Sequence, residues 1–95
     1  GGDPYIDPDR RYLIFASNRP GEKGRVDIYL AIADGKGGWS NPIPFDGRVN
    51  TPGHELCPLV SLDGTAFLFT SNKDIRWVSA QVIEDMIAAH EAGDD

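Results

Sequence analysis

The 95-residue sequence predicts an all-β protein of short antiparallel strands that ends in one short helix. Three observations predict this class. Short apolar runs alternate with turn residues, these runs recur as an internal repeat, and helical spacing is found only near the carboxyl end. The 11 glycines and 7 prolines follow no collagen period, and such a density is typical of many turns between short segments.

The first half of the chain contains two predicted strands, a turn and an edge segment. Residues 12–16 form an apolar run whose length favours a buried strand, and residues 27–30 predict a second strand. Residues 34–38, Asp-Gly-Lys-Gly-Gly, predict a tight reversal, because glycine readily adopts positive φ angles. Pro42 and Pro44 restrict the next segment to an edge strand, since proline cannot donate to a ladder.

The second half repeats this pattern and then changes period. Strands are expected at residues 58–60, 66–70 and 75–78, with a turn at Asp63-Gly64. Apolar residues then fall on one helical face: Val82, Ile83, Met86 and Ile87. We expect a helix over residues 79–91, with Ser79 as its N-cap and Gly93 as its stop.

An internal repeat relates the two halves. Residues 4–18 align with residues 58–72 at a constant offset of 54 and are identical at five positions. Downstream, Asp27-Ile28 matches Asp74-Ile75 at an offset of 47, so the first copy has the longer loop. A period near 50 that contains only short strands is typical of β-propeller blades. The sequence therefore predicts a first blade over residues 1–52, an incomplete second blade over 53–78, and a helix with an acidic tail over 79–95.

At these residues the sequence resembles the TolB-type, WD-repeat-like β-propeller family. Its repeat reads Pro-x-x-Ser-Pro-Asp-Gly, then an apolar strand ending in Phe and Ser-Asn, then Asp-Ile-Tyr. The matching residues are Pro4, Asp9, Phe15, Ser17, Asn18, Asp27, Ile28 and Tyr29, and again Pro58, Ser61, Asp63, Gly64, Phe69, Ser71, Asn72, Asp74 and Ile75. The departures are Asp7 and Arg10 in the first copy, and Leu62 and Arg76 in the second.

The resemblance covers about residues 4–78 and implies a fold: about one and a half to two carboxy-terminal antiparallel blades of a six-bladed propeller. It also implies a periplasmic or cell-surface location in a bacterium. The function we expect is a non-catalytic scaffold that binds a protein or ligand. The alternative is an accessory propeller of a peptidase or an oligogalacturonate lyase, with most catalytic residues outside this chain.

Composition limits the partners. The net charge of -6 and the absence of basic clusters argue against nucleic acid. No apolar run approaches the roughly 20 residues of a membrane span. An incomplete ring leaves sheet faces bare, so the expected partners are other blades, from a longer chain or from further copies. A helix folded back over those faces is the remaining possibility. We assign no catalytic, cofactor-binding or metal-binding residue.

A few residues are candidates for contacts or for turns. Trp39 and Trp77, with Tyr29, form a candidate stacking patch, although aromatic residues of blades more often lie between sheets. His54 is a candidate contact, and we expect Glu55 beside it to cap backbone amides. The apolar neighbours of Cys57 predict a packed small side chain. The expected turn residues, whose side chains bond their own backbone, are Asp9, Asn18, Asp63 and Asn72.

Overall fold

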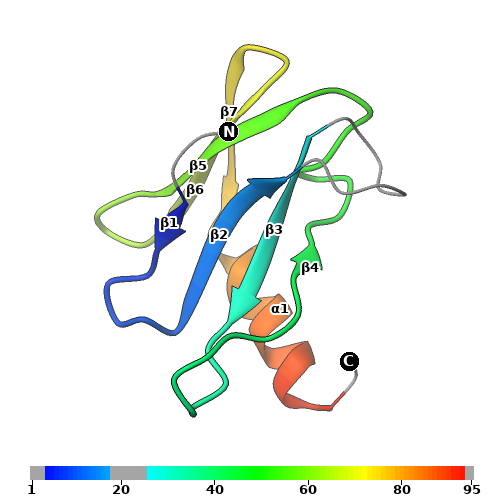
Figure 1. The fold of residues 1–95 in the computed structure, drawn as a ribbon. Coiled ribbons are helices and arrows are strands. Elements are labelled where there is room, and N and C mark those ends of the chain that lie inside the picture. The colour runs from blue at the N-terminus through cyan, green and yellow to red at the C-terminus, as the bar shows by residue number, and fades with distance from the viewer. Residues whose placement is uncertain (1–3, 18–25, 94–95) are drawn as a thin grey trace.

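The computed structural model describes residues 4–17 and 26–93, except for the side chain of Leu56. In chain order the elements are β1 (Tyr5–Ile6), β2 (Tyr12–Ser17), β3 (Asp27–Ile32), β4 (Ile43–Pro44), β5 (Glu55–Val60), β6 (Ala66–Ser71), β7 (Asp74–Ser79) and α1 (Gln81–Glu91) (Figure 1). The protein is therefore mostly β, with two antiparallel sheets and one short carboxy-terminal helix, as predicted.

The first sheet has the order β1-β2-β3-β4. Strands β2 and β3 pair along their whole length, from Tyr12 opposite Ile32 to Ser17 opposite Asp27. All six residues of β3 are buried, so both faces of this central strand are covered. The segment with Pro42 and Pro44 forms β4 at the sheet edge, which confirms the prediction made from the prolines.

The second sheet has the order β5-β6-β7. Its central strand β6 alternates, with Phe67 and Phe69 buried and Leu68 half-buried on the opposite face. Strand β5 contains a β-bulge, because Leu56 lies opposite Thr70 whereas Leu59 lies opposite Leu68. Strand β7 has a single partner, so one of its edges is open among the described residues.

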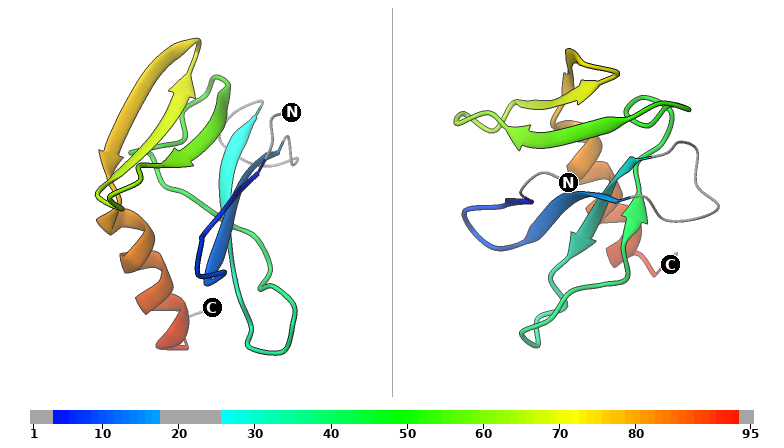
Figure 2. Two further views of the ribbon diagram at one scale, coloured as in Figure 1. Left: turned by 90° about the vertical axis from the view of Figure 1, so that its left-hand side faces the viewer. Right: turned by 45° about the horizontal axis from the view of Figure 1, so that its top comes forward.

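The two sheets stack face to face, and α1 lies beside the second sheet against the lower half of the first (Figure 2). The inward faces build one apolar core to which both sheets and the helix contribute. Its members are Tyr12, Ile14, Ile28, Leu30, Ile32, Phe45, Val49, Val60, Phe67, Phe69, Ala80, Val82, Ile83 and Ile87. The apolar helical face expected from the sequence is thus the face that meets the core. Among residues 4–17 and 26–93 the two sheets do not close into a ring.

The ends of α1 differ in part from the prediction. Ala80, not Ser79, occupies the N-cap position, because Ser79 is the last residue of β7 and pairs with Ala66. The Ser79 hydroxyl nevertheless accepts a hydrogen bond from the Gln81 amide at 3.1 Å. At the other end Gly93 has a φ of +84° and its amide donates to the His90 carbonyl, which confirms the expected glycine stop. No helix of the described residues is both long enough and apolar enough to cross a membrane.

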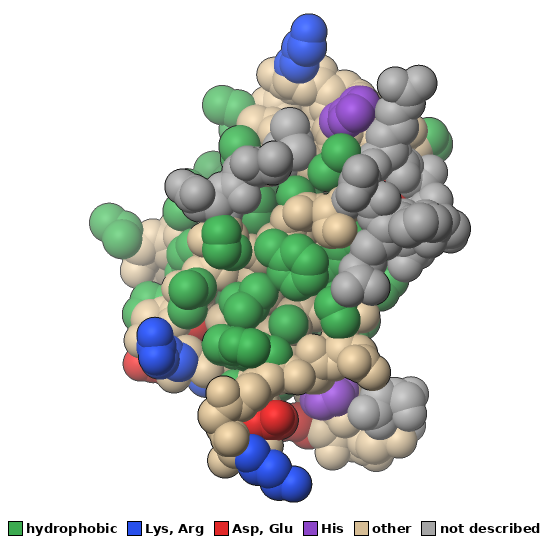
Figure 3. Space-filling view, in the orientation of Figure 1, with side chains coloured by type: hydrophobic (Ala, Val, Ile, Leu, Met, Phe, Trp, Pro, Cys, Tyr) green, Lys and Arg blue, Asp and Glu red, His purple; other side chains and the backbone are tan. Residues whose placement is uncertain are grey.

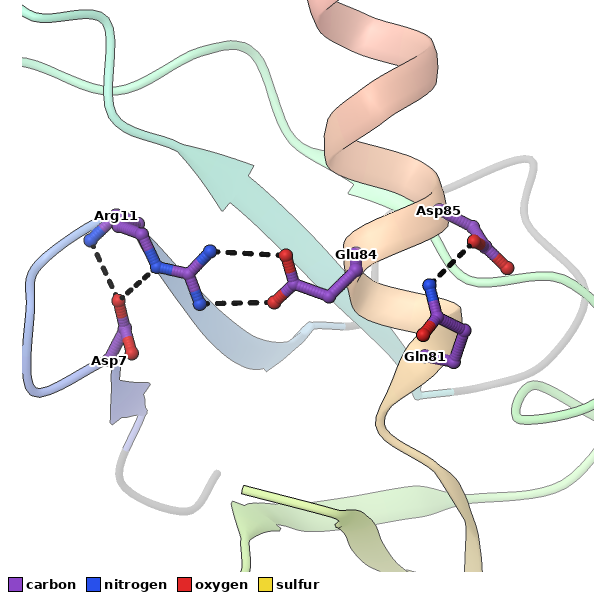
Figure 4. Close-up of polar contacts among 5 residues, drawn as sticks. All are labelled: Asp7, Arg11, Gln81, Glu84 and Asp85. Atoms are coloured by element: carbon purple, nitrogen blue, oxygen red, sulfur yellow. Dashed lines mark hydrogen bonds and ion pairs between the residues drawn. The ribbon is translucent and has the colours of Figure 1, made fainter. Parts of the chain in front are cut away.

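One ion-pair network joins α1 to the turn between β1 and β2 (Figure 4). The Arg11 guanidinium donates to both carboxylate oxygens of Glu84 at 3.1 and 3.0 Å and, through Nε, to Asp7 at 3.1 Å. The hydrogen bond to Glu84 is the main cause that raises the pKa of Arg11 above its usual range. Because the Arg11 and Glu84 side chains are about half exposed, this pair orients the helix and adds little to stability.

Equivalent turns open the two copies of the repeat. The Arg10 amide donates to the Asp7 carbonyl at 2.8 Å, and the Gly64 amide donates to the Ser61 carbonyl at 2.9 Å. Both donors adopt positive φ, +58° at Arg10 and +76° at Gly64. Arginine at the position equivalent to Gly64 therefore keeps the same turn geometry, although arginine adopts this conformation at a cost. The sequence repeat is a repeat of backbone structure as well.

Candidate interaction surface

The outer face of the second sheet, defined by Leu59, Leu68, Thr70, Ile75 and Trp77, is apolar and largely open. Leu59 lies opposite Leu68, and Leu68 lies opposite Trp77, so the three side chains form one row across the sheet. Ile75 follows in the next row, opposite Thr70. Leu59, Ile75 and Trp77 are all exposed. Contiguous exposed apolar side chains of this kind are typical of interaction surfaces.

The outer face of the first sheet, defined by Ile6, Leu13, Phe15, Tyr29 and Ala31, is also apolar. Figure 3 shows hydrophobic side chains gathered over the middle of this sheet, which faces the viewer as in Figure 1. Ile6 is exposed, Leu13 and Phe15 are half-buried, and the Phe15 ring stacks on the buried Tyr29 ring with centroids 5.8 Å apart. Each sheet thus has one face in the core and a second apolar face, which in the first sheet is open at β1 and β2 but covered at β3, where Tyr29 and Ala31 are buried.

The candidate contact residues do not come together. Trp77 lies midway along β7 on the second sheet, whereas Trp39 pairs with Ala33 beyond the end of β3 in the first sheet. Tyr29 is buried within the first sheet. The three aromatic residues therefore form no common stacking patch. Trp39 and Trp77 are both exposed, so neither lies between the two sheets.

His54 is exposed directly before β5, beside the turn that joins β6 to β7. Its amide donates to the Asn72 side-chain oxygen at 3.1 Å, and its carbonyl accepts from the Asn72 amide at 2.9 Å. A pocket of about 590 Å³ opens here, lined in the described part of the chain by His54, Thr70, Asn72 and Lys73. The backbone of His54 is thus held firmly, while its imidazole stays accessible.

Glu55, next to His54, is fully buried and structural. One carboxylate oxygen accepts from the Thr51 amide at 2.9 Å, and the other accepts from the hydroxyls of Thr51 at 2.7 Å and Ser71 at 2.8 Å. The hydrogen bond from the Thr51 amide confirms the expectation that this carboxylate caps a backbone amide. It ties the segment before β5 to the end of β6. These three donors satisfy the hydrogen-bonding capacity of the buried carboxylate, which favours a structural role over a catalytic one.

The predicted turn residues have different environments. Asp63 accepts bonds from the Thr65 amide at 3.0 Å and from the hydroxyls of Thr65 and Ser61, each at 2.7 Å. The Ser61 bond is the main cause that lowers the pKa of Asp63 to about 2. In the first copy the corresponding amide of Arg11 donates to Asp7 at 3.0 Å, and Asp9 lies exposed between them. Asn72 opens the β6–β7 turn with a φ of +50°. Asn18 lies outside the described residues.

The prediction for Cys57 was wrong. Cys57 is exposed and has a φ of +54°, whereas its neighbour Pro58 is buried. The cause is the β-bulge between Leu56 and Leu59, which inserts one residue and turns the Cys57 side chain outward. The apolar residues on either side of Cys57 in the sequence do not indicate that the strand contains this extra residue.

Asn50 is a buried structural residue that no pattern in the sequence indicates. Its buried side chain accepts from the Ile28 amide at 2.8 Å and donates to the carbonyls of Ile28 at 3.0 Å and Phe45 at 2.8 Å. It thereby pairs with β3 as a neighbouring strand would. The signal available in the sequence was an asparagine between apolar Val49 and a Thr-Pro-Gly turn, which is compatible with many loops.

Within residues 4–17 and 26–93, no group of three or more His, Cys, Asp or Glu side chains is placed to hold a metal ion. A second hollow of about 470 Å³ lies between the β1–β2 turn and α1. It is lined by charged side chains, among them Arg11 and Glu84, and by apolar ones, among them Ile32 and Ile87. No protein-family model, curated protein or solved structure matches this sequence.

Proposed function

We propose that this chain is a pair of consecutive blades of a bacterial TolB-like β-propeller and serves as a non-catalytic interaction scaffold. The observation that carries the proposal is the structural repeat. Both copies begin with the same turn, including the positive φ at Arg10 and Gly64, and continue with strands in matching order. Small antiparallel sheets that repeat and stack face to face are the building units of propellers. The proposed location is the periplasm or cell surface.

The proposed partner contacts are Trp39 and His54. Both are exposed at strand ends rather than on a sheet face, and loops held by a rigid scaffold are where binding residues concentrate. Trp39 follows the 34–38 reversal, whose Asp34 carboxylate accepts from the amides of Lys36 and Gly38 at 2.7 and 3.0 Å. These bonds fix the loop and lower the pKa of Asp34. An ordered loop loses little entropy when a partner binds.

Binding to a panel of purified bacterial envelope proteins and glycans tests this function. We expect at least one panel member to bind, and we expect Trp39→Ala or His54→Ala to weaken that complex by tenfold or more, roughly the effect of losing one interface anchor. Leu62→Ala is the matched control, because Leu62 is a fully exposed apolar residue in a turn. Failure of the whole panel, or equal affinity in all three variants, would count against the proposal.

A further inference from the structure

The exposed apolar residues of the second sheet correspond to buried residues of the first. At the offset of 47, Ile75 matches Ile28 and Trp77 matches Leu30. Ile75 and Trp77 are 79% and 67% exposed, whereas Ile28 and Leu30 are both 0% exposed. In β6, the half-buried Leu68 matches the fully buried Ile14 at the offset of 54. We call the side with Ile14, Ile28 and Leu30, and its equivalent with Leu68, Ile75 and Trp77, the leading face.

The opposite sides show the converse relation in the first two strands of each sheet. The third strands depart from it, because Tyr29 on this side of β3 is buried and its equivalent Arg76 in β7 is exposed. Ile6 is 47% exposed, while its equivalent Val60 is 7% exposed and lies in the core. The half-buried Leu13 and Phe15 of β2 match Phe67 and Phe69, which are core residues. We call the side with Val60, Phe67 and Phe69, and its equivalent with Ile6, Leu13 and Phe15, the trailing face.

The interface inside the chain therefore joins unlike faces. The leading face of the first sheet packs on the trailing face of the second, and these residues share one core. Two faces remain outside: the trailing face of the first sheet and the leading face of the second. They have the same two types, and both keep apolar residues at most of the positions that the internal interface buries. Ser79, which matches the core residue Ile32, departs from this pattern. An interface between unlike faces can repeat without limit or close into a ring.

We propose that a second copy of this chain occupies these faces, with the leading face of one copy's second sheet on the trailing face of the next copy's first sheet. The contact would place Leu68, Ile75 and Trp77 against Ile6, Leu13 and Phe15. It repeats the arrangement that already exists within the chain. A contact between two leading faces would have no such template. With two sheets per copy, about three copies give a ring within the 4–8 sheets of known propellers.

This inference depends on the two sheet faces and not on the binding of an outside partner. Trp39 and His54, proposed above as partner contacts, belong to neither face. If the chain self-associates but binds no member of the panel, this inference stands and the proposed function fails. A chain that binds a panel member as a monomer would do the reverse.

A complementation experiment with two blocked variants tests the proposal. Ile6→Lys with Leu13→Lys blocks the trailing face, and Ile75→Lys with Trp77→Lys blocks the leading face. Each variant gains the same charge, so charge attraction cannot join them. Sedimentation velocity measures the mass of the unsubstituted chain, of each variant and of their equal mixture. A control with Ala88→Lys and Ala89→Lys places the same charge on the exposed side of α1.

We expect the unsubstituted chain and the α1 control to sediment well above the 10.4 kDa monomer. Each blocked variant alone should be a monomer, and their mixture should form a one-to-one dimer, since one open interface remains between them. If the unsubstituted chain sediments as a 10.4 kDa monomer at all concentrations, the proposal is overturned, and a different polypeptide must cover the two faces. A mixture that stays monomeric, or association by the variant with only its leading face open, would also overturn it. Circular dichroism of each variant verifies that it is folded.

Discussion

At the scale of a single residue, Asn50 shows how this small protein provides hydrogen-bond partners for buried backbone groups. Its amide side chain is bonded to the amide and carbonyl of Ile28 and to the carbonyl of Phe45. Buried polar groups left without partners are costly, so a loop beside a fully buried strand needs such a side chain. Glu55 likewise accepts hydrogen bonds from the Thr51 amide and from the buried Ser71 hydroxyl.

Asn50→Ala should lower the free energy of unfolding by about 3 kcal/mol, because it leaves buried backbone groups of β3 and the β4 region without partners. Urea denaturation followed by circular dichroism measures the change. The control is Asn41→Ala, at an exposed asparagine, which should change stability by less than about 0.5 kcal/mol. Equal effects of the two substitutions would contradict the role assigned to Asn50.

Asp63 should titrate with a pKa of about 2, below its ordinary value of 3.8. The folded turn favours the ionised carboxylate, so its contribution to stability is present above pH 3.8 and is lost as the pH falls through 2. Carbon-detected NMR of the Asp63 carboxyl measures this midpoint. Thr65→Val removes one donor hydroxyl and should move the midpoint upward. A midpoint of 3.8 in the unsubstituted chain would refute the hydrogen bonding described for this turn.

The residue scale is also where the sequence was least informative. Asp63 could be predicted, because a carboxylate before glycine at a repeated turn has one common use. Cys57 could not be predicted, since the β-bulge that exposes it arises from pairing between distant strands. The same holds for Asn50, whose partners lie 22 residues away along the chain. A local sequence pattern predicts hydrogen bonds within its own turn, but it contains little information about bonds to residues far along the chain.

The β6–β7 hairpin illustrates the scale of single elements. Ser71 pairs with Asp74, so the loop contains only Asn72 and Lys73, and their φ angles are +50° and +76°. Two positive φ angles in a two-residue loop match the type I′ turn, whose twist fits antiparallel strands. Asparagine is common at the first position, and glycine at the second is the preferred residue. Lysine at position 73 therefore holds a strained conformation.

Lys73→Gly should stabilise the protein by roughly 0.5–1 kcal/mol, because glycine adopts positive φ without steric cost. Lys73→Ala is the matched control: it also removes the lysine side chain but keeps the Cβ, and it should bring no gain. Thermal unfolding of the three proteins measures the difference. A gain of the same size in both variants would show that the charge, and not the backbone, matters at this position.

Strands and the helix were predictable because their signals are local. The apolar runs, the prolines of β4 and the helical face of α1 each lie in a continuous stretch, and each forms the expected element. The N-cap was misplaced because β7 continues to Ser79, and that length is determined by pairing with β6. Element type follows from the local pattern, whereas element length follows from the neighbouring strand.

At the scale of the whole molecule, the defining property is that two equivalent sheets pack through unlike faces. The repeat could be read from the sequence, but which side of each strand lies in the core could not, because both sides of β2 and β3 are apolar. The structure resolves this by burying Ile28 and Leu30 while exposing Ile75 and Trp77 at the equivalent positions. Ile6 and Trp77 thus lie exposed at positions whose equivalents, Val60 and Leu30, the internal interface buries.

Photocrosslinking from position 77 tests this account most directly. A photoreactive phenylalanine replaces Trp77, isotope-labelled and unlabelled chains are mixed, and mass spectrometry identifies the crosslinked residues of the other copy. The account predicts intermolecular crosslinks to the trailing face of the first sheet, at or next to Ile6, Leu13 and Phe15. Crosslinks to β5–β7 of the other copy, or an absence of intermolecular crosslinks at concentrations of about 100 μM, a range in which weak protein association is detectable, would contradict it.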